Sequence, residues 1–429
     1  MTYIPRQLET VILDYLNEDV PRGLVLTGLV GAGKTTMIRQ ICNRLSGRYR
    51  IFNFTGDDIQ FRLSASMDSR FVLNEVRSQT TERALIFVDE IQKSADILDN
   101  LKVALDEGGC SFIVTGSNPA YLRNQAVKRL QRRAIVFDLF PFSLNEIFSA
   151  RGWVELAGAC KLKDLILGDI LPEEFLYRSY ERELVLEALG EYRHIGTIPF
   201  VLTGNTLEDK FRLIGQVINR GLPPIEGIDQ NIYDIVLTEL AKLNEREFTY
   251  QTILQKTRLK RREKIDRILR YLCENGVLFR RSRIIFEPSR ISYHFISTFV
   301  DPGIVSYLTG RWNRSMDNGF DIQSFVRIGL ENLKNFVPLK IEVGYYKPYY
   351  ITPSGQVKYK DGEIDFIVSV GDRIIPIEVK SAVSINKIDT SLIASFIRER
   401  SLRFGIVFYF GETFWDSVKR ILYLPVWVL

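Results

Sequence analysis

Eight residues near the start of the sequence have the types and the spacing of a phosphate-binding loop. Gly28–Thr35 spells Gly-Leu-Val-Gly-Ala-Gly-Lys-Thr, which fits the pattern G-x4-G-K-[ST]. In such a loop the glycines let successive backbone N–H groups point at phosphate oxygens. We expect Lys34 to reach the β- and γ-phosphates of ATP and the Thr35 hydroxyl to bind its Mg²⁺. The residues predicted to bind the cofactor are Gly28, Gly31, Ala32, Gly33, Lys34, Thr35 and Thr36.

A pair of acids fits the same chemistry. The four apolar residues Leu85–Val88 are followed by Asp89 and Glu90. A carboxylate at the end of a buried strand can hold the Mg²⁺ of bound ATP, which is the role expected of Asp89, and Glu90 can polarise the attacking water. The alternative is two surface acids that begin a loop. The apolar run before them and the phosphate-binding loop favour the metal-binding interpretation.

Further polar groups could contact the γ-phosphate. Thr115-Gly116-Ser117-Asn118 ends an apolar run, so either hydroxyl could sense the phosphate, although the same residues also suit an ordinary turn. Arg133 is the last of four cations before the next apolar run and could act as an arginine finger. Its alternative role is a solvated helix end, where the helix dipole favours cations. Use of Arg133 by a neighbouring copy would need a homo-oligomer.

The elements that must position these residues alternate along the first part of the chain. Short apolar runs of β-forming residues predict buried strands at residues 24–27, 51–54, 85–89, 112–115 and 135–139. Helical periodicity lies between them, so we expect an α/β fold with a parallel sheet covered by helices. Residues 1–140 would form this core, residues 141–225 a helical lid, residues 226–300 a small helical unit, and residues 301–429 a second α/β domain.

The third of these segments contains a dense run of positive charge. The whole chain carries a formal net charge of only +5, yet residues 256–290 hold twelve Lys or Arg and four Asp or Glu. An apolar helical stripe runs through the segment, and Val277–Phe286 resembles a β-hairpin wing with Arg-Arg-Ser-Arg at its tip. A basic helix with a basic wing predicts a winged helix that binds DNA. The predicted contacts are Arg258, Lys260, Arg261, Arg262, Arg280, Arg281 and Arg283; the alternatives are a solvated face or a protein-binding winged helix.

A second candidate metal site lies near the C-terminus. If Gly371-Asp372 is a two-residue hairpin turn, Asp365 lies across from Glu378 on two paired strands. Opposed carboxylates repel each other, and a divalent cation between them removes that cost. Mg²⁺ held there would polarise a phosphodiester, and Lys380, on the same face, would orient the water or stabilise the transition state. The alternative is a solvated hairpin with an ordinary Glu–Lys pair, and Pro376 favours an edge strand.

The chain resembles a known group on several of these residues. The resemblance rests on Ile4-Pro5-Arg6, Gly31–Thr36, Val88–Lys93, Val114–Ser117 and Phe140–Ile147. The group is that of archaeal and bacterial AAA-like ATPases, related to the signal-transduction NTPases, with a winged helix and a PD-(D/E)xK nuclease-like, restriction-endonuclease-like C-terminal domain. The resemblance implies that Glu331 completes the second metal site.

The sequence departs from that group in the phosphate-binding loop, which lacks the Arg pair that many members have before the final glycine, and at two further places. Arg132 replaces the glycine that precedes the group's arginine, which Arg133 matches. At the lid, the group's Gly-Gly-x-Pro element is Gly196-Thr197-Ile198-Pro199, which keeps Pro199 as the residue expected near the nucleotide.

Composition excludes other classes of protein. Four scattered cysteines form no C-x-x-C pair, and two histidines cannot support a histidine cluster. No signal peptide or membrane-spanning run is present, so we expect a cytoplasmic protein. The function expected is an ATP-binding and ATP-hydrolysing protein that binds DNA and cleaves it with a Mg²⁺-dependent nuclease-like domain. The alternative is an ATP-switched regulator that binds DNA or protein and whose nuclease-like domain does not cleave. A kinase is disfavoured because Glu90 suits water activation.

Overall fold

The computed structural model describes residues 3–156, 158–221, 225–259, 261–284, 286, 294–311, 320–353 and 357–429. Its N-terminal part is a five-stranded parallel sheet with strand order β2-β3-β4-β1-β5. The strands are β1 (Gly23–Gly28), β2 (Arg50–Thr55), β3 (Ala84–Asp89), β4 (Ser111–Thr115) and β5 (Ala134–Leu139). All five predicted strands are present, so the predicted α/β fold with a parallel sheet is confirmed.

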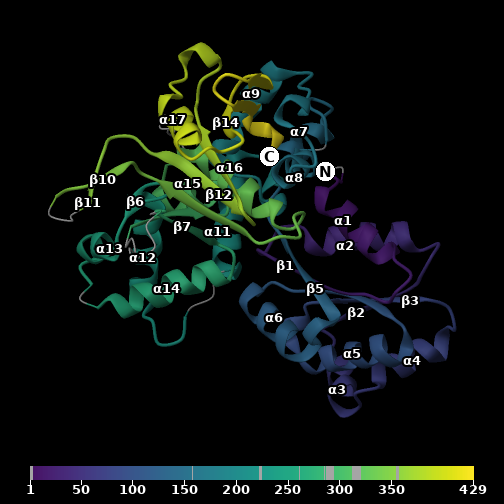
Figure 1. Ribbon diagram of the computed structural model, residues 1–429. Helices are drawn as coiled ribbons and strands as arrows, with labels where there is room; N and C mark the ends of the chain where they lie inside the picture. The colour runs from purple at the N-terminus through teal and green to yellow at the C-terminus, as the bar shows by residue number, and fades with distance from the viewer. Residues whose placement is uncertain are drawn as a thin grey trace.

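Both faces of this sheet are covered by helices (Figure 1). Helices α1 and α2 pack on the face that includes Leu24 and Leu26, and helices α3 to α6 pack on the face that includes Val25. Burial on both sides explains why the strands are continuous apolar runs. The helices are α1 (Gln7–Asn17), α2 (Lys34–Leu45), α3 (Ile59–Met67), α4 (Phe71–Gln79), α5 (Asp96–Gly108) and α6 (Pro119–Gln125), and the short helical turns are η1 (Ile91–Lys93), η2 (Ala126–Leu130) and η3 (Gln131–Arg133).

A helical segment follows the sheet. Its elements are α7 (Leu144–Ala150), α8 (Gly158–Leu167), η4 (Pro172–Glu174), α9 (Arg182–Ile195), α10 (Pro199–Leu202) and α11 (Leu207–Gly221). The segment also receives the end of the chain, because the backbone carbonyl of Leu429 accepts a hydrogen bond from the N–H of Asn145 at 3.0 Å. The indole of Trp427 is fully buried there and donates to the Ser179 hydroxyl at 2.9 Å.

The next unit alternates three helices with a small antiparallel sheet of strand order β6-β8-β7. Its elements are α12 (Gln230–Lys242), β6 (Glu247–Phe248), α13 (Tyr250–Thr257), α14 (Arg262–Glu274), β7 (Leu278–Ser282) and β8 (Phe295–Phe299). The stripe of Ile265, Ile268, Leu269 and Leu272 is buried, as the helical period predicts.

The predicted hairpin over Val277–Phe286 is wrong. Strand β7 pairs with β8, so Arg-Arg-Ser-Arg forms no tip. The chain does not turn there because Ile284 donates its N–H to the carbonyl of Tyr345 at 2.8 Å, and Arg283 forms a bridge with Tyr345. Strand alternation then directs Arg281 and Arg283 inward, where they are only 2% and 5% exposed.

The C-terminal part is built on a six-stranded mixed sheet of order β15-β16-β14-β13-β12-β9. Its strands are β9 (Ile341–Tyr346), β12 (Ile364–Val370), β13 (Arg373–Val379), β14 (Gly405–Tyr409), β15 (Phe414–Asp416) and β16 (Ile421–Pro425), and β10 (Tyr349–Ile351) and β11 (Val357–Tyr359) form a separate pair. The helices are α15 (Pro302–Thr309), α16 (Phe320–Leu333) and α17 (Ser391–Glu399), with short turns η5 (Ile385–Lys387) and η6 (Val426–Val428).

The predicted register of the C-terminal hairpin is confirmed. Phe366 pairs with Ile377 and Val368 with Ile375. The expectation of an edge strand is wrong, because β13 lies between β12 and β14. Pairing with β14 begins at Ile377, one residue after Pro376, so the proline lies outside that ladder.

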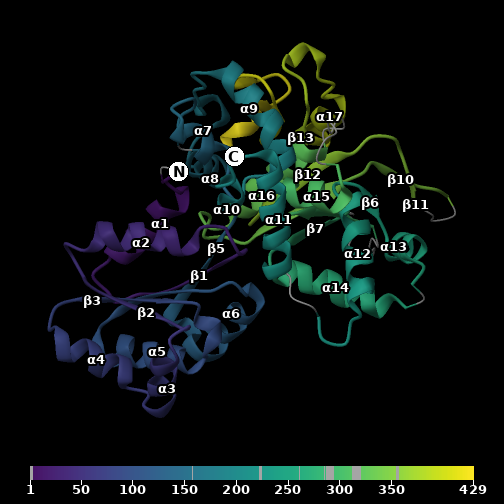
Figure 2. The ribbon, with the colours of Figure 1, turned by 180° about the vertical axis from the view of Figure 1, so that it is seen from behind.

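The helical segment, the three-helix unit and the C-terminal sheet share one continuous apolar core, which also reaches α1 and α2. Figure 2 shows these parts side by side, with the five-stranded sheet and α3 to α5 forming the opposite lobe. Among the described residues, no helix has the length and apolar character needed to cross a membrane.

A buried ion pair links β7 to the loop before β6. Arg281 Nη1 lies 2.7 Å from Glu245 Oε2, and both side chains are at most 1% exposed. Arg281 also stacks on the ring of Phe366, with its Cζ 4.2 Å from the ring centroid, and so joins the three-helix unit to the C-terminal sheet.

We expect Arg281→Ala to lower the free energy of unfolding by about 3–5 kcal/mol, because it leaves the carboxylate of Glu245 buried without its ion-pair partner. Urea unfolding followed by tryptophan fluorescence measures the change. The control is Arg212→Ala, which removes an exposed pair with Glu208 and should leave the unfolding midpoint unchanged. Equal midpoints for the two variants would contradict the prediction.

Candidate functional site

The phosphate-binding loop joins β1 to α2. Gly33 precedes α2 with a φ of 91°, a left-handed conformation that favours glycine. The Lys34 ammonium donates to the carbonyls of Gly28 and Leu29 at 2.8 and 3.0 Å. Burial lowers the pKa of Lys34 to about 8, and the nearby carboxylates of Glu90 and Asp89 oppose this decrease. The cation therefore lies inside the loop, where phosphate oxygens would offer it better partners than carbonyls do.

Asp89 connects three of the predicted residues. Its Oδ2 accepts a hydrogen bond from Thr35 Oγ1 at 2.7 Å, and its Oδ1 accepts one from the Thr115 hydroxyl. The oxygens of Thr35 and Asp89 therefore lie together, which fits the donor set predicted for Mg²⁺. The completely buried Thr115 directs its hydroxyl at Asp89, so its geometry favours a role in orienting this carboxylate over sensing phosphate.

Glu90 lies at the same edge in a strained conformation. Its φ of 54° is left-handed, which is uncommon for a residue with a side chain. Its N–H donates to Asp89 Oδ1 at 3.0 Å, and its carboxylate accepts a hydrogen bond from the Gln92 amide. Gln92 was not singled out from the sequence. Strain of this kind persists where surrounding contacts over-determine it, often at functional sites.

The loop opens into a cavity of about 440 Å³. Eight of the predicted residues line it: Gly31, Gly33, Lys34, Thr35, Thr36, Glu90, Ser117 and Pro199. Gly28 and Ala32 do not line it. The remaining wall was not predicted and includes Tyr3, Ile4, Arg6, Phe142, Phe200 and Thr203. This wall comes from the N-terminus and the helical segment, and it supplies the apolar and aromatic surface that a nucleotide base needs.

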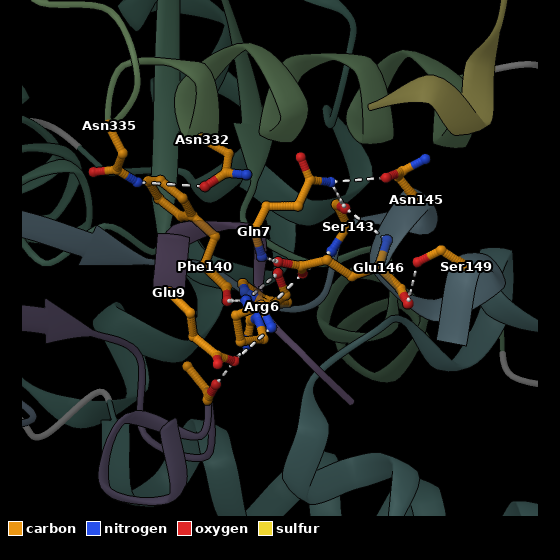
Figure 3. Close-up of polar contacts among 12 residues, drawn as sticks. Arg6, Gln7, Glu9, Phe140, Ser143, Asn145, Glu146, Ser149, Asn332 and Asn335 are labelled. Atoms are coloured by element: carbon orange, nitrogen blue, oxygen red, sulfur yellow. Dashed lines mark hydrogen bonds and ion pairs between the residues drawn. The ribbon is translucent and has the colours of Figure 1, made fainter. Parts of the chain in front are cut away.

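Arg6, which lines the cavity, joins three parts of the chain, and Figure 3 shows it beside Phe140 and Glu146. The buried guanidinium donates to the carbonyl of Ala32 at 3.1 Å and to that of Phe140 at 2.6 Å. It also lies 3.1 Å from a carboxylate oxygen of Glu146 on α7. The other carboxylate oxygen of Glu146 accepts the N–H of Gln7 at 2.8 Å. One side chain therefore fixes the phosphate-binding loop against β5 and the helical segment.

A backbone segment before α10 forms a second connection. The N–H of Phe200 donates to the carbonyl of Gly31 at 3.1 Å, and the carbonyl of Thr197 accepts the N–H of Phe142 at 3.1 Å. The N–H of Thr197 donates to a carboxylate oxygen of Asp301 at 2.7 Å. Asp301 is fully buried at the start of α15, and burial raises its pKa to about 7. The segment therefore connects the cavity to the C-terminal part.

Arg133 lies far from the phosphate-binding loop of its own chain. It precedes β5, whose first residue pairs with Gly23 at the start of β1, whereas the loop follows the end of β1. A strand of this length separates the two ends by about 17 Å. The guanidinium donates to Asp106 at 2.8 Å. A finger role within one chain is therefore wrong, and only a neighbouring copy could use Arg133.

The C-terminal hairpin brings the second set of residues together. Asp365 and Glu378 are 5% and 7% exposed, and the Lys380 ammonium contacts the carboxylate of Glu378. Asp365 accepts the N–H of Val379 and the side-chain amide of Gln323, each at 2.7 Å. Burial and the carboxylate of Glu378 raise the pKa of Asp365 well above its usual range, and burial raises that of Glu378. The two carboxylates resist being ionised together because their negative charges repel. A cation between them would remove this repulsion.

The expectation that Glu331 completes this site is wrong. Glu331 forms ion pairs with Arg327 and Lys334 and faces α14 and β7. Gln323, two helical turns earlier on α16, contacts Asp365 instead. Within the described part of the chain, no group of three or more His, Cys, Asp or Glu side chains could hold a metal ion. The site therefore offers two carboxylates and one amide.

The basic segment is divided between interior and surface. Arg281 and Arg283 are buried in ion pairs with Glu245 and Glu247, so their predicted contact with DNA is wrong. Arg280 is half-buried and stacks on the ring of Phe295. The candidates that remain exposed at the N-terminal end of α14 are Arg258, Arg261 and Arg262, and Lys260 lies outside the described residues.

Comparisons with known protein families find a match for the N-terminal part of the chain and another for the C-terminal part. Residues 21–148 match the AAA domain family, and residues 335–429 match a domain of unknown function, DUF4143. No curated protein matches the chain. The N-terminal sheet and its phosphate-binding loop therefore match an AAA domain.

The solved structures to which this chain is similar include DnaA proteins, with low sequence identity and low TM-scores. The replication initiator DnaA bound to AMPPCP and single-stranded DNA has 14% identity and a TM-score of 0.28, covering 64% of this chain and 91% of that chain. AMPPCP-bound DnaA from Aquifex aeolicus has 15% identity and a TM-score of 0.28, covering 63% and 90%. Similarity at this level does not determine the function of this chain.

We expect Asp365→Asn to raise the thermal unfolding midpoint in EDTA, and to raise it more at pH 8 than at pH 5. Unfolded Asp365 ionises near its usual pKa of 3.8, whereas the folded carboxyl holds its proton to higher pH. The wild type therefore loses stability as the pH rises from the pKa of Asp365 in the unfolded chain to its higher pKa in the folded chain. The amide variant has no proton to lose there and keeps its stability.

The Gln323 amide can rotate to satisfy the new amide group, so no buried donor is left unpaired. Differential scanning fluorimetry measures the midpoints. A midpoint for Asp365→Asn below that of the wild type at pH 8 would contradict the expected repulsion between the two carboxyls.

Proposed function

We propose that this chain binds and hydrolyses ATP, binds DNA, and has a nuclease-like C-terminal domain that acts with Mg²⁺. The observation that carries the first part is the position of Asp89. Its carboxylate contacts the hydroxyl of Thr35, at the edge of a cavity that Lys34 and Glu90 also line. A bound Mg²⁺ would neutralise charge on the β- and γ-phosphates.

The chain's own groups have distinct tasks in this reaction. Lys34 places its positive charge on the terminal phosphates, and Thr35 with Asp89 provides the oxygens for the metal. Glu90 accepts a hydrogen bond from the attacking water and orients it. Ser117, which lines the cavity, is the hydroxyl suited to contact the γ-phosphate. Arg6, Phe142 and Pro199 close the cavity from the other side and exclude water.

The DNA-binding proposal rests on the unit at residues 226–300. Its order of helix, strand, two helices and two strands is the order expected of a winged helix, which supports α14 as the proposed recognition helix. The exposed cations Arg258, Arg261 and Arg262 lie where this helix begins. Phosphate contacts commonly come from such positions.

The nuclease-like proposal rests on Asp365, Glu378 and Lys380. The two carboxylates share one end of the β12–β13 hairpin, and the ammonium contacts one of them. The alternative function is an ATP-switched regulator whose nuclease-like domain does not cleave. Its support is the amide of Gln323 where the resemblance implies a third carboxylate, together with the small exposed fraction of Asp365.

We expect Glu90→Gln to lower kcat for ATP hydrolysis by about 10²–10⁴-fold while nucleotide binding is retained, because the amide cannot act as a base. Lys34→Ala should abolish both turnover and tight binding. A phosphate-release assay and a fluorescent ATP analogue give the two readouts. Undiminished turnover in Glu90→Gln would show that this carboxylate is not the base.

Plasmid cleavage separates the two functions proposed for the C-terminal domain. Supercoiled plasmid is incubated with the protein, ATP and either Mg²⁺ or Mn²⁺, with Asp365→Asn as the paired variant. The nuclease proposal expects nicked circles from the wild type and none from the variant. Absence of nicking by the wild type, or equal nicking by both proteins, would support the regulator that does not cleave.

A further inference from the structure

A two-stranded hairpin extends from the C-terminal part beyond the six-stranded sheet. Strands β10 and β11 pair antiparallel, with Tyr350 opposite Lys358. Figures 1 and 2 both show the hairpin extending from the edge of the molecule, near β6 and α13. Tyr350 is 47% exposed, and Tyr359 is 37% exposed. Isolated pairs of strands are marginal in water, so this one needs support at its base.

The hairpin is positively charged and aromatic. Residues 347–360 contain three lysines and three tyrosines but no acid. Lys358 and Lys360 are exposed, and neither forms an ion pair with any described residue. The chain's other exposed cations are often paired with a carboxylate, as Arg270 is with Asp266. Unpaired lysines beside exposed rings leave a positive surface available to a partner.

The base of the hairpin is held by the three-helix unit. The guanidinium of Arg283 stacks on Tyr359, with its Cζ 3.9 Å from the ring centroid, and pairs with Glu247 of β6. The ammonium of Lys347 lies 3.9 Å from the same carboxylate. The rings of Tyr349 and Tyr359 meet edge to face at 6.4 Å. These contacts use one face of the hairpin.

The other face remains available. Directly paired residues of two strands point to the same side, so Tyr350 and Lys358 share this face. A flat ring beside an ammonium suits a nucleotide, because the ring stacks on a base and the cation contacts the adjacent phosphate. An acidic peptide would need only the lysines.

The hairpin also lies close to the carboxylate site along the chain. Only five residues separate Tyr359 from Asp365, so the two lie within about 20 Å of each other even if this segment is fully extended. Glu363, in this connection, is close enough to Glu378 to contribute to its raised pKa. A strand of nucleic acid bound on the hairpin can therefore continue to Asp365 and Glu378.

We propose that the β10–β11 hairpin is an arm that binds single-stranded nucleic acid, with Tyr350 stacking on a base and Lys358 and Lys360 contacting phosphates. The proposal rests on the proposed binding of DNA and assigns part of that binding to a surface other than the winged helix. The buried Arg281 and Arg283 cannot contact phosphates, and the arm supplies exposed cations in their place.

Fluorescence anisotropy of the full chain tests the arm. The first probe is a fluorescein-labelled 30-nucleotide thymidine oligomer. The second probe is the duplex of this oligomer with a complementary deoxyadenosine oligomer. We expect Tyr350→Ala to raise Kd for the single strand by at least fivefold and Tyr350→Phe to retain wild-type affinity, because stacking needs the ring. We expect Lys358→Ala combined with Lys360→Ala to reduce the salt slope, d log K/d log[KCl], by about 1.4 in magnitude, from about 0.7 for each phosphate contact.

Matched controls separate the arm from the proposed winged helix. Lys340→Ala removes an exposed lysine from the start of β9 and should leave Kd unchanged, and unchanged thermal midpoints exclude unfolding of the hairpin variants. If the wild type binds neither probe, the DNA-binding proposal and the arm both fail. If Arg261→Ala with Arg262→Ala weakens binding but the hairpin variants bind as the wild type does, the arm alone is wrong. Competition by polyglutamate that equals competition by the unlabelled oligomer would also overturn the arm, because it would indicate an acidic protein partner.

Discussion

The guanidinium of Arg6 is the contact on which the relation between the nucleotide cavity and the rest of the chain depends. It binds the carbonyl of Ala32 within the phosphate-binding loop and that of Phe140 just after β5, and it pairs with Glu146 of α7. Arg6 and Glu146 are almost completely buried, so breaking one contact would leave a charge or a polar group without water. The loop, the sheet and the helical segment are consequently fixed as one unit.

The segment before α10 extends this unit toward the C-terminal part. Thr197 uses both of its backbone polar groups there, one with Phe142 and one with Asp301. Gly196 fits because a side chain would overlap Asp301, whose Oδ1 lies 1.8 Å from the position of a Cβ atom. A displacement of Phe200 by a bound nucleotide would therefore act on α15 through two hydrogen-bonded residues. This connection gives the phosphate-binding loop a physical path to the C-terminal part of the chain.

Features that depend on residues close together in the sequence could be predicted, and features that depend on contacts between distant segments could not. The five strands and the register of β12 with β13 follow from periodicities within a few residues, and they were predicted correctly. The far wall of the cavity is made by Tyr3, Phe142 and Phe200, which only the fold brings together. Glu331 was assigned to the carboxylate site by resemblance. In the structure it forms an ion pair with the buried Arg327 on the same helix, so its carboxylate points away from that site.

The basic segment shows why charge along a sequence differs from charge on a surface. Residues 281 and 283 point to the same side of an extended segment, and the acids Glu245 and Glu247 that neutralise them lie outside the counted stretch. A count over residues 256–290 therefore overestimates the charge available to DNA. Burying these pairs costs desolvation, which is offset only when hydrogen bonds and stacking fix their geometry, as Phe366 and Tyr359 do here. The two arginines thus orient the three-helix unit on the C-terminal sheet.

The same reasoning about charge bears on the carboxylate site. Asp365 and Glu378 would attract a divalent cation, but Lys380 contacts Glu378, and Arg281 lies close enough to Asp365 to oppose the rise in its pKa. The third neighbour, Gln323, contributes no charge. The attraction for a metal ion from the protein alone is therefore weaker than that of a site with three carboxylates. Under the proposed nuclease function, a phosphate of the bound nucleic acid would supply the missing negative charge. Metal and nucleic acid would then bind cooperatively, because each removes the repulsion that opposes the other.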